Sequence, residues 1–369
     1  MGKQILLLLR IVLRKLLKAV GRNLPRGIYY FVPGANWSID WDGYYITSNI
    51  AKENHIKAQT INDPRWLIGQ LIHYGSLGDF LGNLNETHNK RNKIVVTVFH
   101  GNPDDNSLPF KEPFSKLLDN VDQIDRLIVA NRIMEERFLV WGVESSKIAR
   151  IPLGVDLGIF KPTSAEQKLQ TRAELGIAQN AFCIGSFQKD GNGWDEGLEP
   201  KLVKGPDIFL QTVKLLGRQY PNLFILLSAP ARGYIKNGLE ELKISYCHKN
   251  FSDYREVADL YPALDAYLIT SREEGGPKGI LEAMASGVPL VSTRVGMAED
   301  VAANGKDALL ADIDDVDGLT KHLSNIIDDV ELQNTLSVNG LKTVRDYDWP
   351  KISERYYHEV YKPLLDQRS

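Results

Sequence analysis

The sequence contains little cysteine, with only Cys183 and Cys247 among its 369 residues. Two distant cysteines form neither a metal-binding spacing nor a disulfide framework, which favours a reducing, cytoplasmic compartment. Long hydrophobic runs are also missing, because no stretch reaches the roughly 18 uncharged apolar residues that a membrane-spanning helix needs. The net charge is −3, so the chain as a whole lacks the basic footprint of a nucleic-acid-binding protein.

The N-terminal segment differs in charge from the chain as a whole, because residues 1–26 carry several basic residues and no acidic ones. Arg10, Arg14, Lys18 and Arg22 recur at every fourth position, which places them along one face of a helix. A cationic amphipathic helix of this kind can lie in an anionic membrane interface. The protein would then be peripheral at the inner face of the cell membrane. The alternative is a helix that packs on its own domain with a solvated basic face.

Beyond residue 26, short β-rich runs alternate with helical patterns. Strands are expected at 28–32, 94–100, 126–130, 149–153, 182–187, 223–228, 244–247, 266–270, 289–293 and 308–311. Most of these are continuous apolar runs, which are typical of strands buried on both faces of a parallel sheet. The helical patterns between them, such as 206–217 and 278–285, indicate an α/β protein of two doubly wound, Rossmann-like domains.

A stretch with Gly154, Gly158 and Pro162 separates the two expected domains. A charged helix and a new strand follow it. We therefore expect an N-terminal domain at residues 27–155, a linker at 156–170 and a C-terminal domain at 171–345. The last helix, within residues 346–369, is rich in tyrosine and is expected to pack back on the N-terminal domain.

One strand–loop–helix segment carries the clearest chemical pattern. A strand ends at Thr270, a loop with Gly275 and Gly276 follows, and a helix is expected to begin near Pro277. Ligands of open α/β sheets bind at the carboxyl ends of strands, beside helix N-termini. The free N–H groups and the helix dipole there favour phosphate or sugar oxygens, and glycines let a ligand approach the backbone.

Two glutamates flank this loop. Glu274 lies in the loop and Glu282 lies in the following helix. In such places each carboxylate could accept a pair of vicinal hydroxyls, one pair from a sugar and one from a ribose. The alternative, from the spacing alone, is a helix-cap charge at Glu274 and an exposed helical acid at Glu282.

This segment resembles the E-x7-E signature of the family 4 retaining glycosyltransferases, which have the GT-B fold of two Rossmann-like domains facing a cleft. The matching residues are Ser271, Glu274, Gly275, Glu282, Ala283, Met284, Ala285, Gly287 and Pro289. The departure is Gly276-Pro277-Lys278, where Phe-Gly is commoner. The segments 129–138, 142–156 and 254–261 are also similar to the family, so the resemblance covers roughly residues 28–360.

For the donor site, the resemblance implies roles position by position. Glu282 looks like the carboxylate that holds the nucleotide ribose, and Glu274 looks like the one that contacts the donor sugar. Lys204 would neutralise the diphosphate, and Lys189 would replace the arginine that usually follows the first strand of this domain. The remaining expected donor-binding residues are Gly275, Gly276, Pro277 and Lys278.

For the N-terminal domain, the resemblance implies that His100 ends a strand and faces the reacting sugar. Gly34 resembles the glycine-rich turn that approaches the donor phosphates. Trp37 and Trp41 could stack on an acceptor sugar, and core packing is the open alternative for both.

The activity implied by this resemblance is hexosyl transfer from a UDP- or GDP-sugar to a glycan, lipid-linked or small-molecule hydroxyl. Surface polysaccharide or glycolipid synthesis would use such a reaction. The resemblance implies no cofactor and no metal, so Asp40-Trp-Asp42 is interpreted as an incidental match to D-x-D. The alternatives are another GT-B enzyme (a nucleotide-sugar epimerase or a phosphorylase) and a non-catalytic, membrane-apposed sugar-nucleotide binder.

Deletion of residues 1–24 should move the protein from anionic lipid vesicles to the soluble fraction in a sedimentation assay. Each lysine or arginine near an anionic surface contributes about 1 kcal/mol, and the deletion removes most of this basic segment. Vesicles of neutral lipid serve as the control. Unchanged binding of the truncated chain to anionic vesicles would contradict the interfacial helix.

Overall fold

The computed structural model describes residues 26–34, 38–65, 67–84, 91–102 and 111–367 of the chain. Apart from Arg26, the basic helix expected at 1–26 lies outside the described residues, as does Trp37. Within the described residues, no helix is long and apolar enough to cross a membrane. The chain divides into two compact units. One contains the described residues up to Val129, with Glu135–Ile151 and the chain from Trp349 onward; the other contains Ala130–Met134 and Pro152–Asp348.

The first unit contains a parallel sheet whose six described strands have the order β2-β1-β3-β4-β5-β6. The strands are β1 (Ile28–Phe31), β2 (Ala58–Ile61), β3 (Leu71–Tyr74), β4 (Lys93–Thr97), β5 (Arg126–Val129) and β6 (Ile148–Arg150). Every residue of β1 and β3 is buried, as expected where helices cover both faces of a sheet. The strand order reverses between β1 and β3, so the carboxyl ends of these two strands form the crevice of this sheet.

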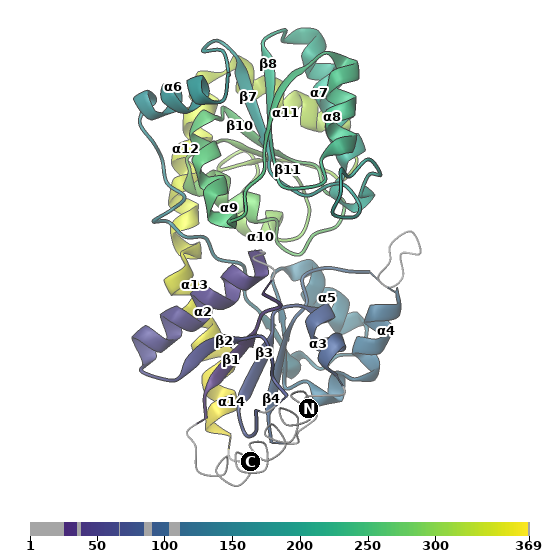
Figure 1. Ribbon diagram of the computed structural model, residues 1–369, viewed down its shortest axis with the longest axis vertical. Coiled ribbons are helices and arrows are strands. Elements are labelled where there is room, and N and C mark those ends of the chain that lie inside the picture. Colours follow the sequence, from purple (N-terminus) through teal and green to yellow (C-terminus); the bar gives the residue numbers. More distant parts are fainter. Residues whose placement is uncertain (1–25, 35–37, 66, 85–90, 103–110, 368–369) are drawn as a thin grey trace, which may run out of the picture. The chain divides into compact units, whose positions relative to one another are not determined.

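Helices flank this sheet (Figure 1). They are α2 (Ser38–Asn54), α3 (Leu77–Asn83), α4 (Lys111–Asp119) and α5 (Arg132–Val140), with short turns η1 (Val121–Gln123) and η2 (Ser145–Lys147). The C-terminal chain also belongs to this unit, as α13 (Trp349–Arg355), the π-helical η6 (Tyr356–Tyr361) and α14 (Lys362–Asp366). The ring of Trp349 stacks on that of Tyr45 in α2, with the centroids 5.4 Å apart.

His73 of β3 links the sheet to the C-terminal helices. Its Nδ1 lies 2.5 Å from Tyr361 Oη, and its Nε2 lies 2.8 Å from Thr97 Oγ1. Burial lowers the pKa of His73 to about 3, so the imidazole is neutral in the folded protein. Because both ring nitrogens have hydrogen-bond partners, His73 is a structural histidine that holds the C-terminal segment against the sheet.

The second unit contains another parallel sheet, whose six described strands have the order β12-β11-β10-β7-β8-β9. The strands are β7 (Phe182–Ser186), β8 (Leu223–Ser228), β9 (Ser245–Lys249), β10 (Ala266–Ile269), β11 (Leu290–Thr293) and β12 (Leu309–Ala311). This is the strand order of dinucleotide-binding Rossmann sheets, in which the connection reverses between the first and fourth strands. The reversal here falls between β7 and β10.

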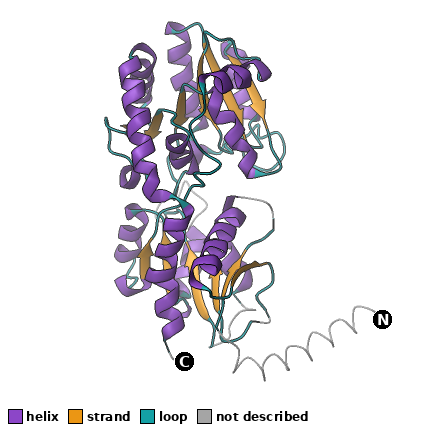
Figure 2. Cartoon of the chain, turned by 90° about the vertical axis from the view of Figure 1, so that its left-hand side faces the viewer, coloured by secondary structure: helices purple, strands orange, loops and turns teal. Residues whose placement is uncertain are grey.

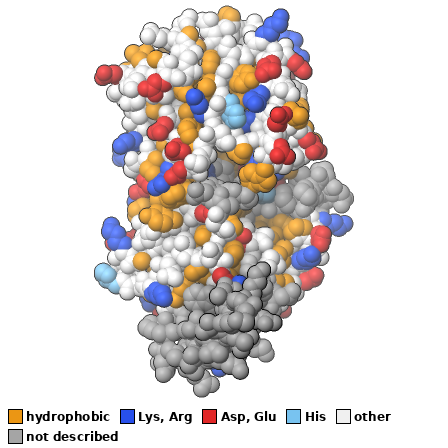
Figure 3. Space-filling view, viewed as in Figure 1, with side chains coloured by type: hydrophobic (Ala, Val, Ile, Leu, Met, Phe, Trp, Pro, Cys, Tyr) orange, Lys and Arg blue, Asp and Glu red, His pale blue; other side chains and the backbone are white. Residues whose placement is uncertain are grey.

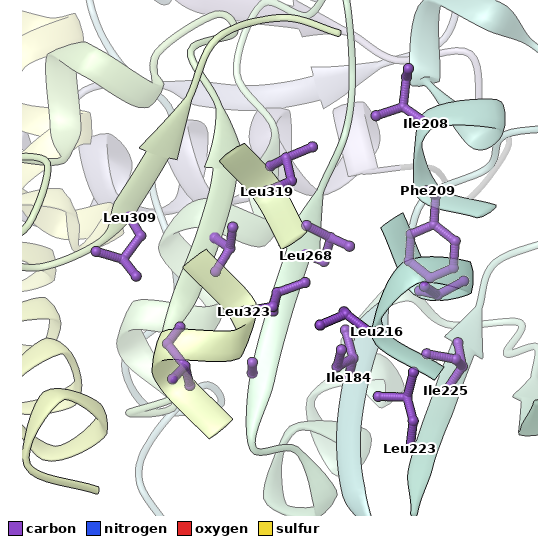
Figure 4. Packing of buried hydrophobic residues seen from close by; sticks show 14 of the residues in the cluster. Ile184, Ile208, Phe209, Leu216, Leu223, Ile225, Leu268, Leu309, Leu319 and Leu323 are labelled. Carbon is purple, nitrogen blue, oxygen red and sulfur yellow. The ribbon is translucent and has the colours of Figure 1, made fainter. Parts of the chain in front are cut away.

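Helices lie on both sides of this second sheet (Figure 2). They are α6 (Ala165–Glu174), α7 (Pro206–Gln219), α8 (Gly233–Leu242), α9 (Lys278–Ala285), α10 (Ala298–Val301), α11 (Val316–Asp328) and α12 (Val330–Thr343). The 3-10 segments are η3 (Leu202–Lys204), η4 (Tyr254–Ala263) and η5 (Val344–Tyr347). The buried apolar side chains of α7, α8 and α11 pack on β7, β8 and β10, with Phe209 and Leu323 among them (Figure 4).

Each strand expected from the sequence has a counterpart in the structure, and α9 matches its expected bounds. The expected strand at 94–100 is too long. β4 ends at Thr97, and the chain then leaves the sheet toward Gly101, where a Cβ would lie 2.1 Å from Phe114. Two strands were not expected. β2 is a half-exposed edge strand, and β3 contains the polar His73, so neither forms an apolar run.

Charged side chains of both signs are distributed over the face shown in Figure 3. No broad patch of one sign covers the described surface on this face, in agreement with the net charge of −3.

The buried His73 predicts that the free energy of unfolding decreases as the pH falls below about 6.5. In the unfolded chain the imidazole takes up a proton near this pH, whereas the folded state excludes that proton until the pH reaches about 3. The contribution of His73 is therefore complete above the unfolded pKa and is lost on acidification, by at most about 1.4 kcal/mol per pH unit. Urea unfolding followed by circular dichroism across this range measures the slope.

His73→Gln should flatten this slope, because glutamine does not titrate. His55→Asn is the matched control, since His55 is exposed and has a positive φ of 52°, which asparagine tolerates. Identical slopes in the wild type and in His73→Gln would contradict the assignment.

Candidate active site

The candidate site lies at the carboxyl ends of β7 and β10, where the strand order of the second sheet reverses. Gln188 follows β7, and Ser271 follows β10. The hydroxyl of Ser271 is 3.2 Å from Gln188 Oε1, and Gln188 Nε2 donates to the carbonyl oxygen of Lys204 at 2.8 Å. The two strand ends and the loop before α7 are thus joined by side chains at the position where Rossmann-like sheets bind ligands.

Glu274 and Lys204 form an ion pair at this position. Their side chains are only 10% and 17% exposed, so each charge is mostly removed from water and each neutralises the other. Ser271 Oγ lies 3.2 Å from the same carboxylate oxygen of Glu274. The pair therefore places one carboxylate and one ammonium in a defined geometry next to the glycine loop.

The turn that carries Lys204 depends on Gly205. Its φ is +62°, in the left-handed region that favours glycine, and a Cβ there would lie 1.9 Å from the carbonyl oxygen of Thr270. The hydroxyl of Thr270 donates to the Gly205 carbonyl oxygen at 2.8 Å. The backbone of the Lys204 turn and the end of β10 thus approach each other more closely than any other residue would allow.

Arg272 links the loop after β10 to the turn that carries Lys204. Its guanidinium donates to both carboxylate oxygens of Asp207 at 2.8 and 2.7 Å, and to the Leu202 carbonyl oxygen at 2.7 Å. Burial acts to raise the pKa of Asp207, but the hydrogen bonds and charge of Arg272 lower it further, and the pKa lies below its ordinary value. The sequence pattern gives no sign of this role for Arg272, which occupies a variable position of the signature.

Two further lysines lie near the ion pair. Burial lowers the pKa of Lys201, repulsion from Lys204 adds to this, and attraction to Glu274 opposes it. The Lys189 ammonium lies 3.8 Å from the centroid of the Trp194 ring, and Lys189 also repels Lys201. Lys189 and Lys204 were expected from the sequence, whereas Lys201 was not. Lys201 lies one turn before Lys204, next to η3, and this position could have indicated its role.

Glu282 is buried on α9, with 4% of its surface exposed. The alternative of an exposed helical acid is therefore wrong. One carboxylate oxygen accepts from the hydroxyl of Tyr254, and the other accepts from the hydroxyl of Tyr261 at 2.8 Å. Burial, followed by the charge of Glu282, raises the pKa of Tyr261 well above its ordinary value, so this hydroxyl remains a donor.

Aromatic packing connects the surroundings of the two glutamates. The ring of Tyr261 meets the ring of Phe187 edge to face, with the centroids 5.1 Å apart. Phe187 is the neighbour of Gln188, whose side chain contacts Ser271 and thereby reaches Glu274. Glu274 and Glu282 thus belong to one continuous set of contacts at the ends of β7 and β10.

The glycine loop is held by contacts within the second unit. Asn131 is fully buried and donates to the carbonyl oxygen of Gly275 at 2.5 Å, a role that the sequence did not reveal. A Cβ on Gly276 would lie 2.9 Å from Leu153, which accounts for the small residue there. Pro277 precedes α9 as its N-cap residue rather than starting the helix, and the Lys278 ammonium lies 5.2 Å from the centroid of the Tyr254 ring.

The remaining expected site residues belong to the first unit. Gly34 follows β1 with a φ of +76°, so this turn needs glycine for its backbone conformation. His100 is half-buried, three residues beyond the end of β4. Trp41 is half-buried on α2, with its ring 5.5 Å from Tyr44 and 6.1 Å from Tyr45. The roles of these residues toward donor and acceptor stay predictions.

Among the described residues, no group of three or more His, Cys, Asp or Glu side chains is arranged to hold a metal ion.

Known proteins resemble this chain in sequence and in structure. Residues 199–343 match the model of the family described as glycosyl transferases group 1. D-inositol 3-phosphate glycosyltransferase of Corynebacterium urealyticum is 24% identical over 328 residues, covering 85% of this chain and 73% of that protein. The protein of the same name from Corynebacterium jeikeium is 26% identical over 262 residues, covering 68% of this chain and 59% of that protein.

A solved structure has the same fold. HepE of Anabaena, in complex with UDP and glucose, matches with a TM-score of 0.74 at 16% identity, over 93% of this chain and 100% of that one. The two doubly wound units and this structural match show the GT-B fold. The match to the glycosyl transferases group 1 family lies within the second unit and includes the E-x7-E segment, whose resemblance predicts this family.

Gly205→Ala should lower both the stability and the transferase activity of the protein, because the new Cβ collides with the Thr270 carbonyl and displaces the Lys204 turn. We expect a loss of more than about 1 kcal/mol of unfolding free energy, measured by urea denaturation. Gly193→Ala is the matched control, since Gly193 also has a positive φ (+71°) but a Cβ there meets nothing within 4 Å. Equal losses in both variants would show that backbone conformation alone, rather than the contact with Thr270, requires Gly205.

Proposed function

We propose that this chain transfers a sugar from a nucleoside diphosphate sugar, UDP- or GDP-linked, to an acceptor hydroxyl with retention of anomeric configuration. The observation that carries the proposal is the arrangement of Glu274, Lys204 and Glu282 at the switch point of the second sheet. One carboxylate paired with a lysine lies beside a glycine loop, and a second buried carboxylate lies on the helix that follows this loop. Crystals of HepE contain UDP-glucose, which supports a donor of this class.

In the proposed reaction, the site mainly stabilises the departing nucleoside diphosphate. As the bond from the anomeric carbon to the diphosphate breaks, negative charge grows on the diphosphate oxygens. Lys204 and Lys201 supply positive charge at this site, and the N-terminal end of α9 directs backbone N–H groups toward the loop that precedes it. The lysines thereby stabilise the transition state more than the bound donor. We assign Lys201, rather than Lys189, to the position of the family's arginine, since Lys189 is already engaged with the Trp194 ring.

The two glutamates have separate tasks in this proposal. Glu282 accepts hydrogen bonds from the ribose hydroxyls, and Glu274 contacts the donor sugar and orients it for attack. His100 and Gly34 in the first unit face the donor, and Trp41 contacts the acceptor. The relatives named for D-inositol 3-phosphate make a phosphorylated small polyol one acceptor to test, alongside glycan and lipid-linked hydroxyls. Residues 1–24 bind an anionic membrane surface on the cytoplasmic side.

Glu274→Gln should lower the rate of sugar transfer by about 100-fold or more while nucleotide binding is retained, because the amide keeps the shape and removes the charge that orients the sugar. A thermal shift panel of UDP, GDP and ADP identifies the base, since ligand at about 100 times its dissociation constant adds about 2.7 kcal/mol of stability. Release of UDP, GDP or ADP from the matching sugar donor then measures turnover.

Glu273→Gln serves as the matched control, because Glu273 is the adjacent carboxylate outside the proposed donor contacts. It should retain turnover. Full turnover in Glu274→Gln would refute the role of Glu274, and a wild-type protein stabilised by none of the three nucleotides would refute the proposed function.

A further inference from the structure

The carboxylate of Glu282 is covered on both oxygens by tyrosine hydroxyls. Tyr254 donates to one oxygen and Tyr261 donates to the other. With 4% of Glu282 exposed, a ribose can reach this carboxylate only if one of the covering side chains moves. The two tyrosines differ in how tightly their rings are packed, and we assign them different roles for this reason.

Tyr261 is held in place by its surroundings. It is 1% exposed, and its ring packs against Phe160, Phe187 and Tyr267 with centroids 5.7, 5.1 and 5.6 Å away. Moving this ring would open a cavity in the core of the second unit, which is energetically unfavourable. The hydroxyl of Tyr261 therefore fixes the orientation of the Glu282 carboxylate.

Tyr254 is placed differently. It is half-buried and is the first residue of η4, so its side chain lies at the edge of the packed region. The Lys278 ammonium lies 5.2 Å from the centroid of its ring, and Phe160 makes a tilted ring contact at 6.3 Å. Because Tyr254 is half-buried, a rotation of its side chain would uncover one carboxylate oxygen of Glu282.

We propose that Tyr261 is a positioning residue for Glu282 and that Tyr254 is a competing donor, which the ribose hydroxyl of the nucleotide replaces on the same carboxylate oxygen. This inference rests on the proposed function and extends it to the selection of ribonucleotides. A ligand without the full ribose diol recovers less of the lost tyrosine hydrogen bond. Displacing the Tyr254 hydroxyl lowers the affinity of both ligands, and the preference for the ribonucleotide comes from the hydrogen bonds of its diol to the oriented Glu282 carboxylate.

The test is calorimetric titration of UDP, GDP and ADP, each beside its 2′-deoxy analogue, into the full chain and its Tyr→Phe variants. Tyr254→Phe should tighten binding of the preferred ribonucleotide about fivefold, because the competitor for the carboxylate is removed. Tyr261→Phe should weaken that binding about fivefold or more and bring the ribo-to-deoxy ratio close to one, since the carboxylate is no longer oriented.

Tyr246→Phe is the matched control, because the Tyr246 hydroxyl donates to the carboxylate of Glu240 in an exposed pair away from the site. It should leave all affinities unchanged. Weaker ribonucleotide binding by Tyr254→Phe would overturn the competition, showing that its hydroxyl assists the ligand. An unchanged ribo-to-deoxy ratio in Tyr261→Phe would overturn the positioning role. If the wild type binds no nucleotide, the proposed function fails; if it binds and only the variants disagree, this inference alone fails.

Discussion

Two carboxylates withdrawn from water at the end of a parallel sheet impose the main constraint on the second unit. A buried carboxylate is costly unless a cation or hydrogen-bond donors compensate it. Glu274 obtains a cation from Lys204, and Glu282 obtains two hydroxyl donors from Tyr254 and Tyr261. The neighbouring loops hold these partners in place.

Close backbone packing and side-chain hydrogen bonds hold the partners of the two glutamates in place. The Lys204 turn approaches the end of β10 so closely that only glycine fits at position 205. Arg272 joins the two loops through Asp207 and the Leu202 carbonyl oxygen, and Asn131 fixes the carbonyl of Gly275. Gly205, Arg272 and Asn131 need not touch a donor to have this effect. Their effect is to restrict the positions of the charged groups, which is what electrostatic catalysis requires of a site.

In the first unit, buried polar and aromatic contacts hold the C-terminal segment on the sheet. Its C-terminal segment comes from the far end of the chain and is tied to β3 through His73, whose two ring nitrogens meet Tyr361 and Thr97. Stacking of Tyr45 on Trp349 adds a second tie between α2 and α13. A polar group inside a strand is tolerated here because both of its nitrogens have partners. The same polar residue interrupts the apolar pattern, so the sequence did not predict this strand.

The sequence by itself determined the α/β class, the strands with continuous apolar runs, the bounds of α9 and the family resemblance of the segment around Glu274 and Glu282. These features are local, because they depend on periodicity, turn residues and a short motif. Only the tertiary structure decided that Glu282 is buried, that Tyr254 and Tyr261 cover it, and that Lys201, Arg272 and Asn131 join the site. Those relations link residues far apart in the chain, and hydrogen bonding and burial across such distances leave no periodic trace in the sequence.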